Sequence, residues 1–268
     1  MSTTLGEYLQ YAGQLLSGFR AAGEKQIAAE RAQDIAPYAG APASLRVLDL
    51  GNGSLRPQYT LLQAAGCAVY GIDWVNRPRR NFFKTAYAIA RALYRWKLGV
   101  PLRDPVPRLI CGDVARLPFA AESFDLITSV AAFEHFLDVP AVVSEVARVL
   151  KPGGLIYARI HLFACPSGGH NVKITEIPLR RLPAGVDAWD HLRRRRLPID
   201  VPLNEWRKEQ YLVEFRKRFE ILKDYCAMRE GEQLLTPEIE SELAPYNRDE
   251  LTCGAYVIVA RKPVAKPA

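Results

Sequence analysis

The sequence predicts an α/β protein with a mainly parallel seven-stranded sheet and helices on both faces. Short buried strands alternate with helical segments after residue 44, an order that requires right-handed crossovers between parallel strands. Two further strands near the carboxyl terminus would close the sheet. Of the 268 residues, 49% are hydrophobic and 24% are charged, which is the composition of a folded globular protein.

Each element has its own signal. Apolar side chains recur at three- and four-residue intervals over residues 3–36, which predicts a helix, and residues 37–43 form a linker. Short runs of mainly apolar residues, typical of buried strands, predict strands at 45–50, 68–72, 108–111, 124–130, 155–162, 219–225 and 254–261. Helices are expected at 60–65, 79–98 and 140–150, the last with a proline in its first turn. We therefore expect a helical cap over residues 1–43 and one domain over residues 44–268.

Two basic insertions interrupt this domain, at residues 77–106 and 163–212. Nine basic residues and one acidic residue lie between Trp74 and Arg108, and eleven basic and six acidic residues lie between Pro178 and Arg218. Because the formal charge of the whole chain is only +7, the remaining residues are net acidic. The basic charge is therefore local, which favours a local partner over a general polyanion-binding surface.

Acidic residues follow three of the predicted strands. The first strand contains Asp49 and runs into a turn with Gly51 and Gly53, and glycines let a backbone approach a ligand closely. Asp73 ends the second strand, where a carboxylate suits a ribose diol, and Asp113 ends the third, where it could accept from an adenine amino group. Ligands of open α/β sheets bind at this carboxyl edge.

The run from Leu45 to Ile160 resembles the class I S-adenosylmethionine-dependent methyltransferases of the type 11 group. The matching pieces are Val47-Leu-Asp-Leu-Gly-Asn-Gly53, Val69-Tyr-Gly-Ile-Asp73, Gly112-Asp-Val-Ala-Arg-Leu-Pro-Phe119, Phe124-Asp-Leu-Ile127 and Val149-Leu-Lys-Pro-Gly-Gly154. The resemblance implies a Rossmann-like class I methyltransferase fold, with S-adenosylmethionine as the cofactor. The family's turn usually has a third glycine, and that place is Leu55 here.

The resemblance also implies roles for individual residues. The methionine end of the cofactor would be held by Asp49, Gly51, Asn52 and Gly53. Asp73 would bind the ribose hydroxyls, and Trp74 would pack on the adenine. Asp113 and Val114 would recognise the adenine amino group, and Val130 is also expected to contact the cofactor. The insertion at 163–212 takes the position that usually forms the lid over the methyl acceptor.

Four histidines lie between residues 135 and 191, where the acceptor site is expected. A hydroxyl acceptor gains from a general base. His161 ends the fifth strand, and His170 follows Ser167-Gly-Gly169, a loop able to fold over the site, so both are candidate bases. His135 is expected to pack beside the cofactor. The spacing of the histidines does not resemble a compact pair of zinc ligands, and the five cysteines are scattered, so no metal site is expected.

The helix predicted at 79–97 has three possible roles. At 100° per residue, Arg80, Lys84, Arg91 and Arg95 share one face, and apolar residues fill the opposite arc. The apolar arc could pack on the body of the protein and leave a solvated basic stripe. Alternatively, the helix could make peripheral contact with an anionic membrane, or the stripe could face an anionic acceptor.

The expected function is O-methylation of a small-molecule or glycan-like acceptor, possibly anionic, in a cytoplasmic biosynthetic role. An RNA or other nucleic-acid methyltransferase and a non-catalytic S-adenosylmethionine-binding protein are the alternatives. Ser129-Val-Ala-Ala-Phe-Glu134 replaces the Asn/Asp-Pro-Pro-Tyr/Phe signature of base-amino methylation, which disfavours nucleic acid. No secretory signal and no membrane-spanning run is apparent. The sequence leaves the acceptor and the oligomeric state open.

Overall fold

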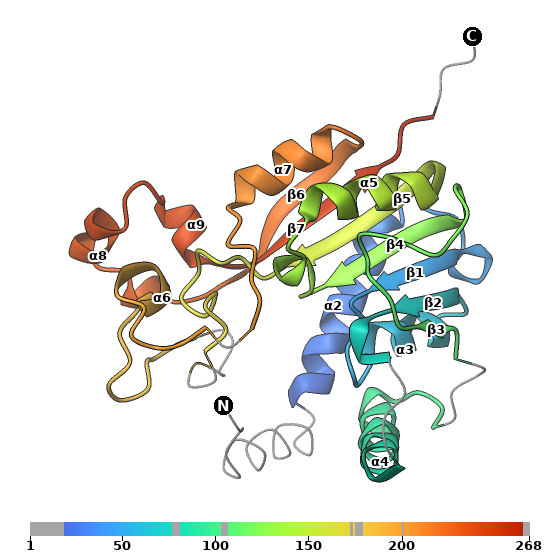
Figure 1. Cartoon of the computed structure of the whole chain (residues 1–268), viewed down its shortest axis with the longest axis horizontal. Coiled ribbons are helices and arrows are strands. Elements are labelled where there is room, and N and C mark those ends of the chain that lie inside the picture. Colours follow the sequence, from blue (N-terminus) through green and yellow to red (C-terminus); the bar gives the residue numbers. More distant parts are fainter. Residues whose placement is uncertain are drawn as a thin grey trace.

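The computed structural model describes residues 19–76, 81–102, 107–171, 174, 179–199 and 201–264, with side chains omitted for 81–87. Within these residues the sheet has seven strands: β1 (Arg46–Leu50), β2 (Ala68–Ile72), β3 (Leu109–Ile110), β4 (Phe124–Val130), β5 (Leu150–Ile160), β6 (Glu220–Arg229) and β7 (Cys253–Arg261). Their order is β3-β2-β1-β4-β5-β7-β6 (Figure 1). Strands β1 to β5 are parallel, and β7 runs antiparallel to its neighbours β5 and β6. The predicted fold class is confirmed.

The described helices include counterparts of the helices predicted from the sequence. They are α2 (Phe19–Ile35), α3 (Pro57–Ala64), α4 (Asn81–Leu98), α5 (Val139–Val149), α6 (Asp190–Arg193), α7 (Lys208–Arg216), α8 (Pro237–Glu242) and α9 (Arg248–Thr252). Short 3-10 turns are η1 (Pro42–Ser44), η2 (Trp74–Asn76), η3 (Phe133–His135) and η4 (Glu232–Leu234). The first predicted helix began at residue 3, and its part before residue 19 lies outside the described residues.

Helices cover both faces of the sheet. On one face, α5 and α7 pack through residues such as Val142 and Phe215. On the other face, α3 packs through Tyr59 and Leu62, together with Ile35 of α2. Figure 1 shows the two groups of helices above and below the sheet. Burial of these apolar surfaces is the main stabilising contribution, at roughly 25 cal/mol per Å².

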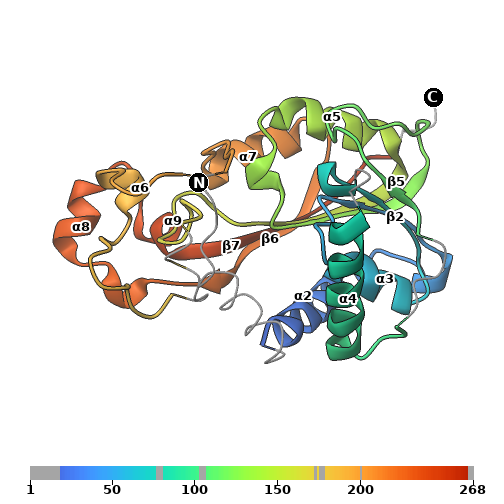
Figure 2. The ribbon, with the colours of Figure 1, turned by 60° about the horizontal axis from the view of Figure 1, so that its bottom comes forward.

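The insert helix α4 packs on α2 and α3. Tyr94 and Leu98 of α4 form a small apolar cluster with Ala21 of α2, and Leu61 of α3 borders that cluster. Leu55, which stands where the family has its third glycine, packs against the same cluster. Figure 2 shows α4 beside α2 and α3. The departure from the glycine pattern therefore has a packing role, because Leu55 helps to attach the insert.

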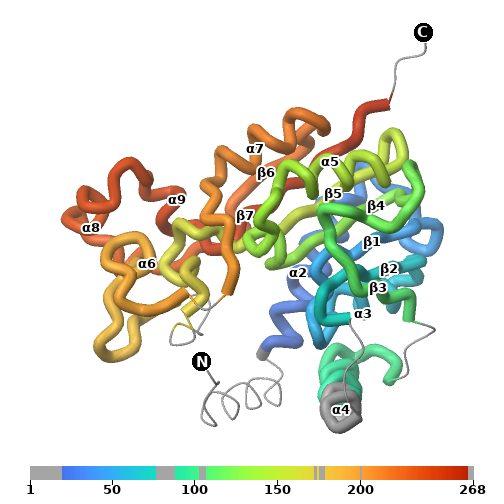
Figure 3. The backbone as a smooth tube through the Cα atoms, in the orientation of Figure 1, coloured from blue at the N-terminus to red at the C-terminus, as the bar shows by residue number. Residues whose placement is uncertain are grey.

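The insertion after β5 and the segment between β6 and β7 join in a second lobe, seen on the left of the tube drawing in Figure 3. Trp189 is fully buried there, and its Nε1 donates to the carbonyl oxygens of Ala164 and Leu251, both at 3.1 Å. Leu235 and Leu243 belong to the same apolar cluster. The lobe is thus larger than the predicted insert at 163–212, because α8 and α9 are part of it.

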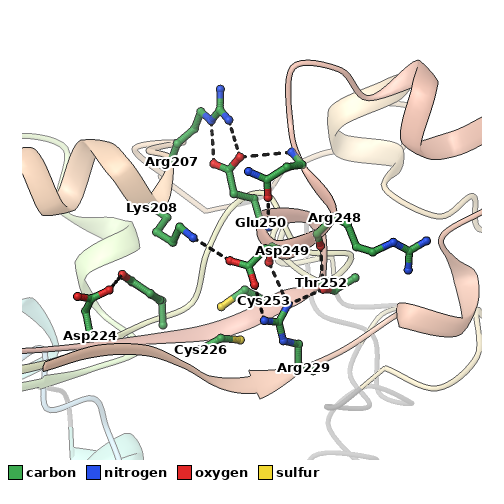
Figure 4. Close-up of polar contacts among 12 residues, drawn as sticks. Arg207, Lys208, Asp224, Cys226, Arg229, Arg248, Asp249, Glu250, Thr252 and Cys253 are labelled. Carbon is green, nitrogen blue, oxygen red and sulfur yellow. Dashed lines mark hydrogen bonds and ion pairs between the residues drawn. The ribbon is translucent and has the colours of Figure 1, made fainter. Parts of the chain in front are cut away.

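Ion pairs fasten this lobe to the sheet (Figure 4). Glu250 of α9 accepts from Arg207, just before α7, at 2.5 and 2.9 Å. Its neighbour Asp249 pairs with Lys208 at 2.8 Å and with Arg229 at the end of β6. The two neighbouring acidic residues Asp249 and Glu250 therefore connect α9 to α7 and β6.

A cavity of about 330 Å³ lies between α2 and α3, lined by residues that include Arg31, Leu45 and Cys67. Leu45 and Cys67 come just before β1 and β2, so the cavity lies at the amino ends of these strands. Ligands of open α/β sheets bind at the opposite edge. Among the helices that the structure describes, none combines the length and the continuous apolar character needed to cross a membrane.

Candidate active site

The glycine turn after β1 is in close contact with the segment after β4. Gly51 has a φ of 69°, and a Cβ at this position would lie 2.4 Å from the Cβ of Ala132, so only glycine fits. Asp73, just after β2, accepts the Gly53 N–H at 2.8 Å through Oδ2 and the Val75 N–H at 2.9 Å through Oδ1. The Asp73 carboxylate therefore holds the turn.

A pair of asparagines connects the ends of three strands. The side-chain amide of Asn52 donates to the carbonyl of Gly53 at 2.9 Å. The amide of Asn76 donates to Asn52 Oδ1 at 3.0 Å and to the carbonyl of Ile110, at the end of β3, at 2.9 Å. Sequence reasoning missed Asn76, whose one signal is its position shortly after Asp73.

Asp49 lies beneath the glycine turn and is 2% exposed. Its Oδ1 accepts from the Thr128 hydroxyl at 3.0 Å, and its Oδ2 has no hydrogen-bond partner among the described residues. Burial raises the pKa of this carboxyl to about 7, although the nearby guanidinium of Arg31 opposes the shift. A buried carboxylate oxygen without a partner suits a ligand that carries a positive amino group.

The remaining predicted cofactor residues lie along the same edge of the sheet. Asp113 follows β3, and its Oδ1 accepts the Ala115 N–H at 2.9 Å. Val114 is buried, whereas Trp74, on η2, is 66% exposed. Val130 is half-buried at the end of β4. The structure thus brings these residues to the carboxyl ends of β2, β3 and β4.

Three of the four histidines form a cluster, called the histidine stack below, in which the rings of His161 and His170 are tilted by 31° and the ring of His135 meets that of His170 edge-on. The rings of His161 and His170 have centroids 4.7 Å apart, and those of His135 and His170 are 4.8 Å apart. Burial, together with the charges of the neighbouring histidines, lowers the pKa of His161 to about 4 and that of His170 to about 3. The fourth, His191, is buried apart from the stack against Phe163, whose carbonyl its Nε2 contacts at 2.7 Å.

A serine and a glutamate support this stack. His161 Nε2 lies 2.7 Å from Ser167 Oγ, and the Ser167 hydroxyl donates to Glu230 Oε1 at 2.5 Å. Glu230 is 2% exposed and follows β6, far along the chain. Sequence reasoning missed Glu230, because nothing in the sequence places the end of β6 beside the turn after β5.

The prediction that Ser167-Gly-Gly169 is a loop able to fold over the site is wrong. Residues 162–169 are buried. A Cβ on Gly168 would lie 2.2 Å from the carbonyl oxygen of Phe163, so the turn packs tightly on the chain leaving β5. His170 follows this buried turn directly and has a left-handed φ of 51°.

Of the three roles left open for the basic helix, the packed apolar arc with a solvated basic stripe does not hold in the described part of α4. Arg95 is buried, and its Nε donates to the carbonyl of Pro101 at 2.6 Å, so it does not belong to an exposed stripe. Instead the apolar residues Ile89, Leu93 and Trp96 are 62%, 38% and 63% exposed. Arg91 is half-buried. The other two members of the predicted stripe, at 80 and 84, lie outside the described side chains.

In the second basic insertion, at residues 163–212, the charge of the arginine run is largely neutralised. Each arginine of the run 193–196 pairs with a carboxylate: Arg193 with Glu242 at 2.5 Å, Arg194 and Arg196 with Asp187 at 3.2 and 3.3 Å, and Arg195 with Glu205 at 2.8 Å. These pairs connect parts of the lobe. The arginine run therefore has a structural role.

The strand order, the glycine turn and the acidic residues after three parallel strands define a Rossmann-like domain of the class I methyltransferase type. Residues 48–158 match a family described as "Methyltransferase domain". This part of the chain, less than half of its length, is therefore similar to a methyltransferase domain, and the match points to S-adenosylmethionine as the cofactor.

Curated relatives share this region. A sterol 24-C-methyltransferase of Pneumocystis carinii (strain B80) is 36% identical over 122 residues, which make up 45% of this chain and 29% of the relative. Sterol 24-C-methyltransferase ERG6B of Gibberella zeae is 32% identical over 117 residues, or 43% of this chain and 27% of the relative. The chain thus spans less than a third of the length of these relatives.

Solved structures share the fold over most of the chain. An S-adenosylmethionine-dependent methyltransferase from Mesorhizobium loti has a TM-score of 0.50 and 20% identity, covering 86% of this chain and 96% of that one. The [4+2]-cyclase SpnF also has a TM-score of 0.50 and 20% identity, covering 90% of this chain and 81% of that one. At this identity the likeness concerns the fold alone.

Proposed function

We propose that the whole chain transfers a methyl group to a hydroxyl of a small-molecule or glycan-like acceptor. The observation that carries this proposal is the connection between the glycine turn and the histidine stack through η3. Ala132 touches the place where a Gly51 side chain would be, and the ring of His135, at the end of η3, packs edge-on against the ring of His170. An acceptor bound at the histidines would therefore lie beside the cofactor turn.

The residues at the carboxyl edge fit the cofactor. Gly51 provides a cradle that any side chain would fill, and Asp49 Oδ2 is a buried acceptor available to the methionine ammonium. The Asp73 carboxylate accepts two backbone N–H groups and keeps further lone pairs for ribose hydroxyls. When bound, S-adenosylmethionine supplies a methyl group that its sulfonium has already activated, so the protein has to align the reactants and exclude water.

A hydroxyl acceptor must also lose its proton, and a positioned base is typically worth about 10²–10⁴-fold in rate. We assign this role to His161 and His170. Because the Ser167 hydroxyl donates to Glu230, His161 Nε2 carries a proton and its Nδ1 has a free lone pair. His170 Nε2 is buried without a hydrogen-bond partner among the described residues. Each ring thus offers a nitrogen that can take a proton.

The basic insert has its own proposed partner, an anionic membrane surface. The exposed faces of Ile89, Leu93 and Trp96 lie on one helix in a segment, 74–108, that has nine basic residues and one acidic residue. Lys97 Nζ lies 4.9 Å from the centre of the Trp96 ring. Apolar and aromatic side chains beside basic ones are typical of helices that lie at a membrane interface. An anionic acceptor held at the membrane would be attracted by the same basic residues.

The test is an acceptor screen with the full chain and S-adenosylmethionine, using sugar phosphates, nucleotide-linked sugars, a sterol and RNA. We expect S-adenosylhomocysteine to form with a hydroxylated acceptor, and mass spectrometry to place the methyl on oxygen. His161→Gln or His170→Gln should lower kcat by about 10²–10⁴-fold while the cofactor Kd stays constant. His191→Gln is the matched control, because His191 is buried outside the stack.

Other products would overturn this proposal in distinct ways. A C-methylated sterol would assign the chain to the reaction named for its curated relatives. Methylated RNA would support the nucleic-acid alternative. Cofactor binding without S-adenosylhomocysteine from any acceptor would support a non-catalytic binding protein.

A further inference from the structure

Three side chains that can bind a metal converge where two separate segments meet. Glu134 and His135 belong to η3, after β4, and His170 belongs to the turn after β5. One potential ligand atom from each lies within 4.8 Å of the other two. The sequence does not predict this cluster, because His170 is distant from the other two along the chain and only the parallel pairing of β4 and β5 brings them together.

Two of these side chains have polar atoms that the rest of the protein leaves unpaired. Glu134 is 2% exposed, and neither of its carboxylate oxygens makes a hydrogen bond of good geometry within the residues that the structure describes, although the backbone N–H groups of Glu134 and His161 lie near enough to favour its ionised form. The buried Nε2 of His170 has no hydrogen-bond partner among these described residues. Buried polar groups are almost always paired, so orphan atoms of a carboxylate and an imidazole at one place need a shared partner. A cation would supply it.

The surroundings hold His135 in the form that a metal requires. His135 Nδ1 lies 2.9 Å from the carbonyl oxygen of Pro202. A carbonyl can only accept, so Nδ1 carries the proton and Nε2 carries the lone pair, which is the usual arrangement of a metal-bound histidine. The backbone N–H of Asn204 donates to the carbonyl of Glu134 at 2.9 Å and fixes η3. His170 keeps a left-handed φ of 51°, a strained conformation of the kind found at functional sites.

We propose that Glu134, His135 and His170 bind one divalent transition-metal ion. Two imidazoles and one carboxylate favour ions such as Mn²⁺, Fe²⁺ or Zn²⁺ over Mg²⁺ and Ca²⁺, and three protein ligands leave coordination positions open. If the proposed function holds, an acceptor hydroxyl can occupy an open position, where the ion lowers the pKa of that hydroxyl. His170 then serves as a ligand, and the base role falls to His161.

A neighbouring group, His161, Cys165 and Glu230, has equally close ligand atoms. One atom of each, however, already contacts the Ser167 hydroxyl: His161 Nε2, Cys165 Sγ and Glu230 Oε1, which leaves Glu230 Oε2 as the one oxygen of this group without a partner among the described residues. We therefore assign the ion to the Glu134 cluster alone.

The test uses the full chain treated with EDTA and then titrated with Mn²⁺ or Zn²⁺ by calorimetry, without cofactor or acceptor. We expect one ion per chain. Glu134→Gln, His135→Gln and His170→Gln should each weaken binding at least tenfold. His191→Gln and His161→Gln are matched controls that should bind like the unaltered chain. Substitution with Co²⁺ provides a second readout, because its visible absorption reports nitrogen and oxygen ligation even for a variant of low stability.

The outcomes separate this inference from the proposed function. Absence of binding by the unaltered chain, or equal binding by all three ligand variants, would overturn the metal site. Methyl transfer that persists in EDTA-treated, metal-free protein would overturn its catalytic role and leave the proposed function intact. Metal binding that follows the predicted pattern, with no O-methylated product, would support the site and overturn the function.

Discussion

At the scale of single residues, Asp49 links burial to cofactor binding. Burial and the nearby Glu24 and Asp73 raise its pKa, and Arg31 and the Thr128 hydroxyl lower it, with a net value of about 7. The unliganded protein therefore keeps Asp49 mostly protonated below pH 7, whereas only the ionised form attracts a cofactor ammonium. We predict that cofactor affinity rises with pH up to about 7, by at most about tenfold per unit, and then levels off.

Calorimetry at pH 6, 7 and 8 would measure this dependence. Asp49→Asn should bind the cofactor more weakly and with little change over the same range. A pH dependence that survives in Asp49→Asn would mean that another group is responsible.

Two glycines give opposite predictions for stability. Gly168→Ala should destabilise the fold by about 3 kcal/mol, because a Cβ would lie 2.2 Å from a backbone carbonyl oxygen that is itself fixed. Gly23 lies in α2 with nothing within 4 Å of its Cβ position, so Gly23→Ala should stabilise the fold by about 0.5–1 kcal/mol. Urea unfolding of the two variants checks both signs, and equal effects would contradict the packing of the turn.

At the scale of elements, positions were predictable from the sequence and orientations were not. The predicted bounds of β2 and β4 agree with the structure, and those of α4 agree within two residues. Strand β5 begins earlier than expected, because Leu150 already pairs with Phe124. The sequence left the orientation of α4 open, because its partner is the α2–α3 layer, in which Arg95 is bound by the chain around Thr60 and Pro101. An amphipathic pattern shows that a helix has two faces, and the tertiary contacts decide which one is covered.

The exposed face of α4 gives the prediction at this scale. The protein should co-sediment with vesicles of phosphatidylglycerol and phosphatidylcholine, and far less with phosphatidylcholine alone, because the segment is basic. Leu93→Glu with Trp96→Glu should reduce binding more than tenfold, since each buried apolar side chain contributes about 1.5–3 kcal/mol.

Val213→Glu is the control for that experiment, because Val213 is 55% exposed on α7 on the other face of the sheet. Binding that is the same for both vesicle types, or unaffected by the double variant, would exclude α4 as the contact.

At the scale of the whole molecule, the sequence predicts the cofactor edge better than the acceptor side. Asp49, Asp73 and Asp113 are predictable because each lies at or just after the carboxyl end of a strand, and parallel strands bring these ends together. The histidine stack depends on the pairing of η3, the turn after β5 and the end of β6, and no local pattern encodes that pairing. The spacing argument against a metal site likewise considers only neighbours along the chain.

The central claim is that S-adenosylmethionine binds at the carboxyl edge of β1 and β2, and calorimetry with Asp73→Ala tests it most directly. Asp125→Asn is the matched control, because the Asp125 carboxylate also accepts a backbone N–H, that of Arg46, but at the amino edge of the sheet. We predict one cofactor per chain for the unaltered protein and for Asp125→Asn, and binding at least 100-fold weaker for Asp73→Ala. No binding by the unaltered protein, or equal binding by Asp73→Ala, would contradict the account.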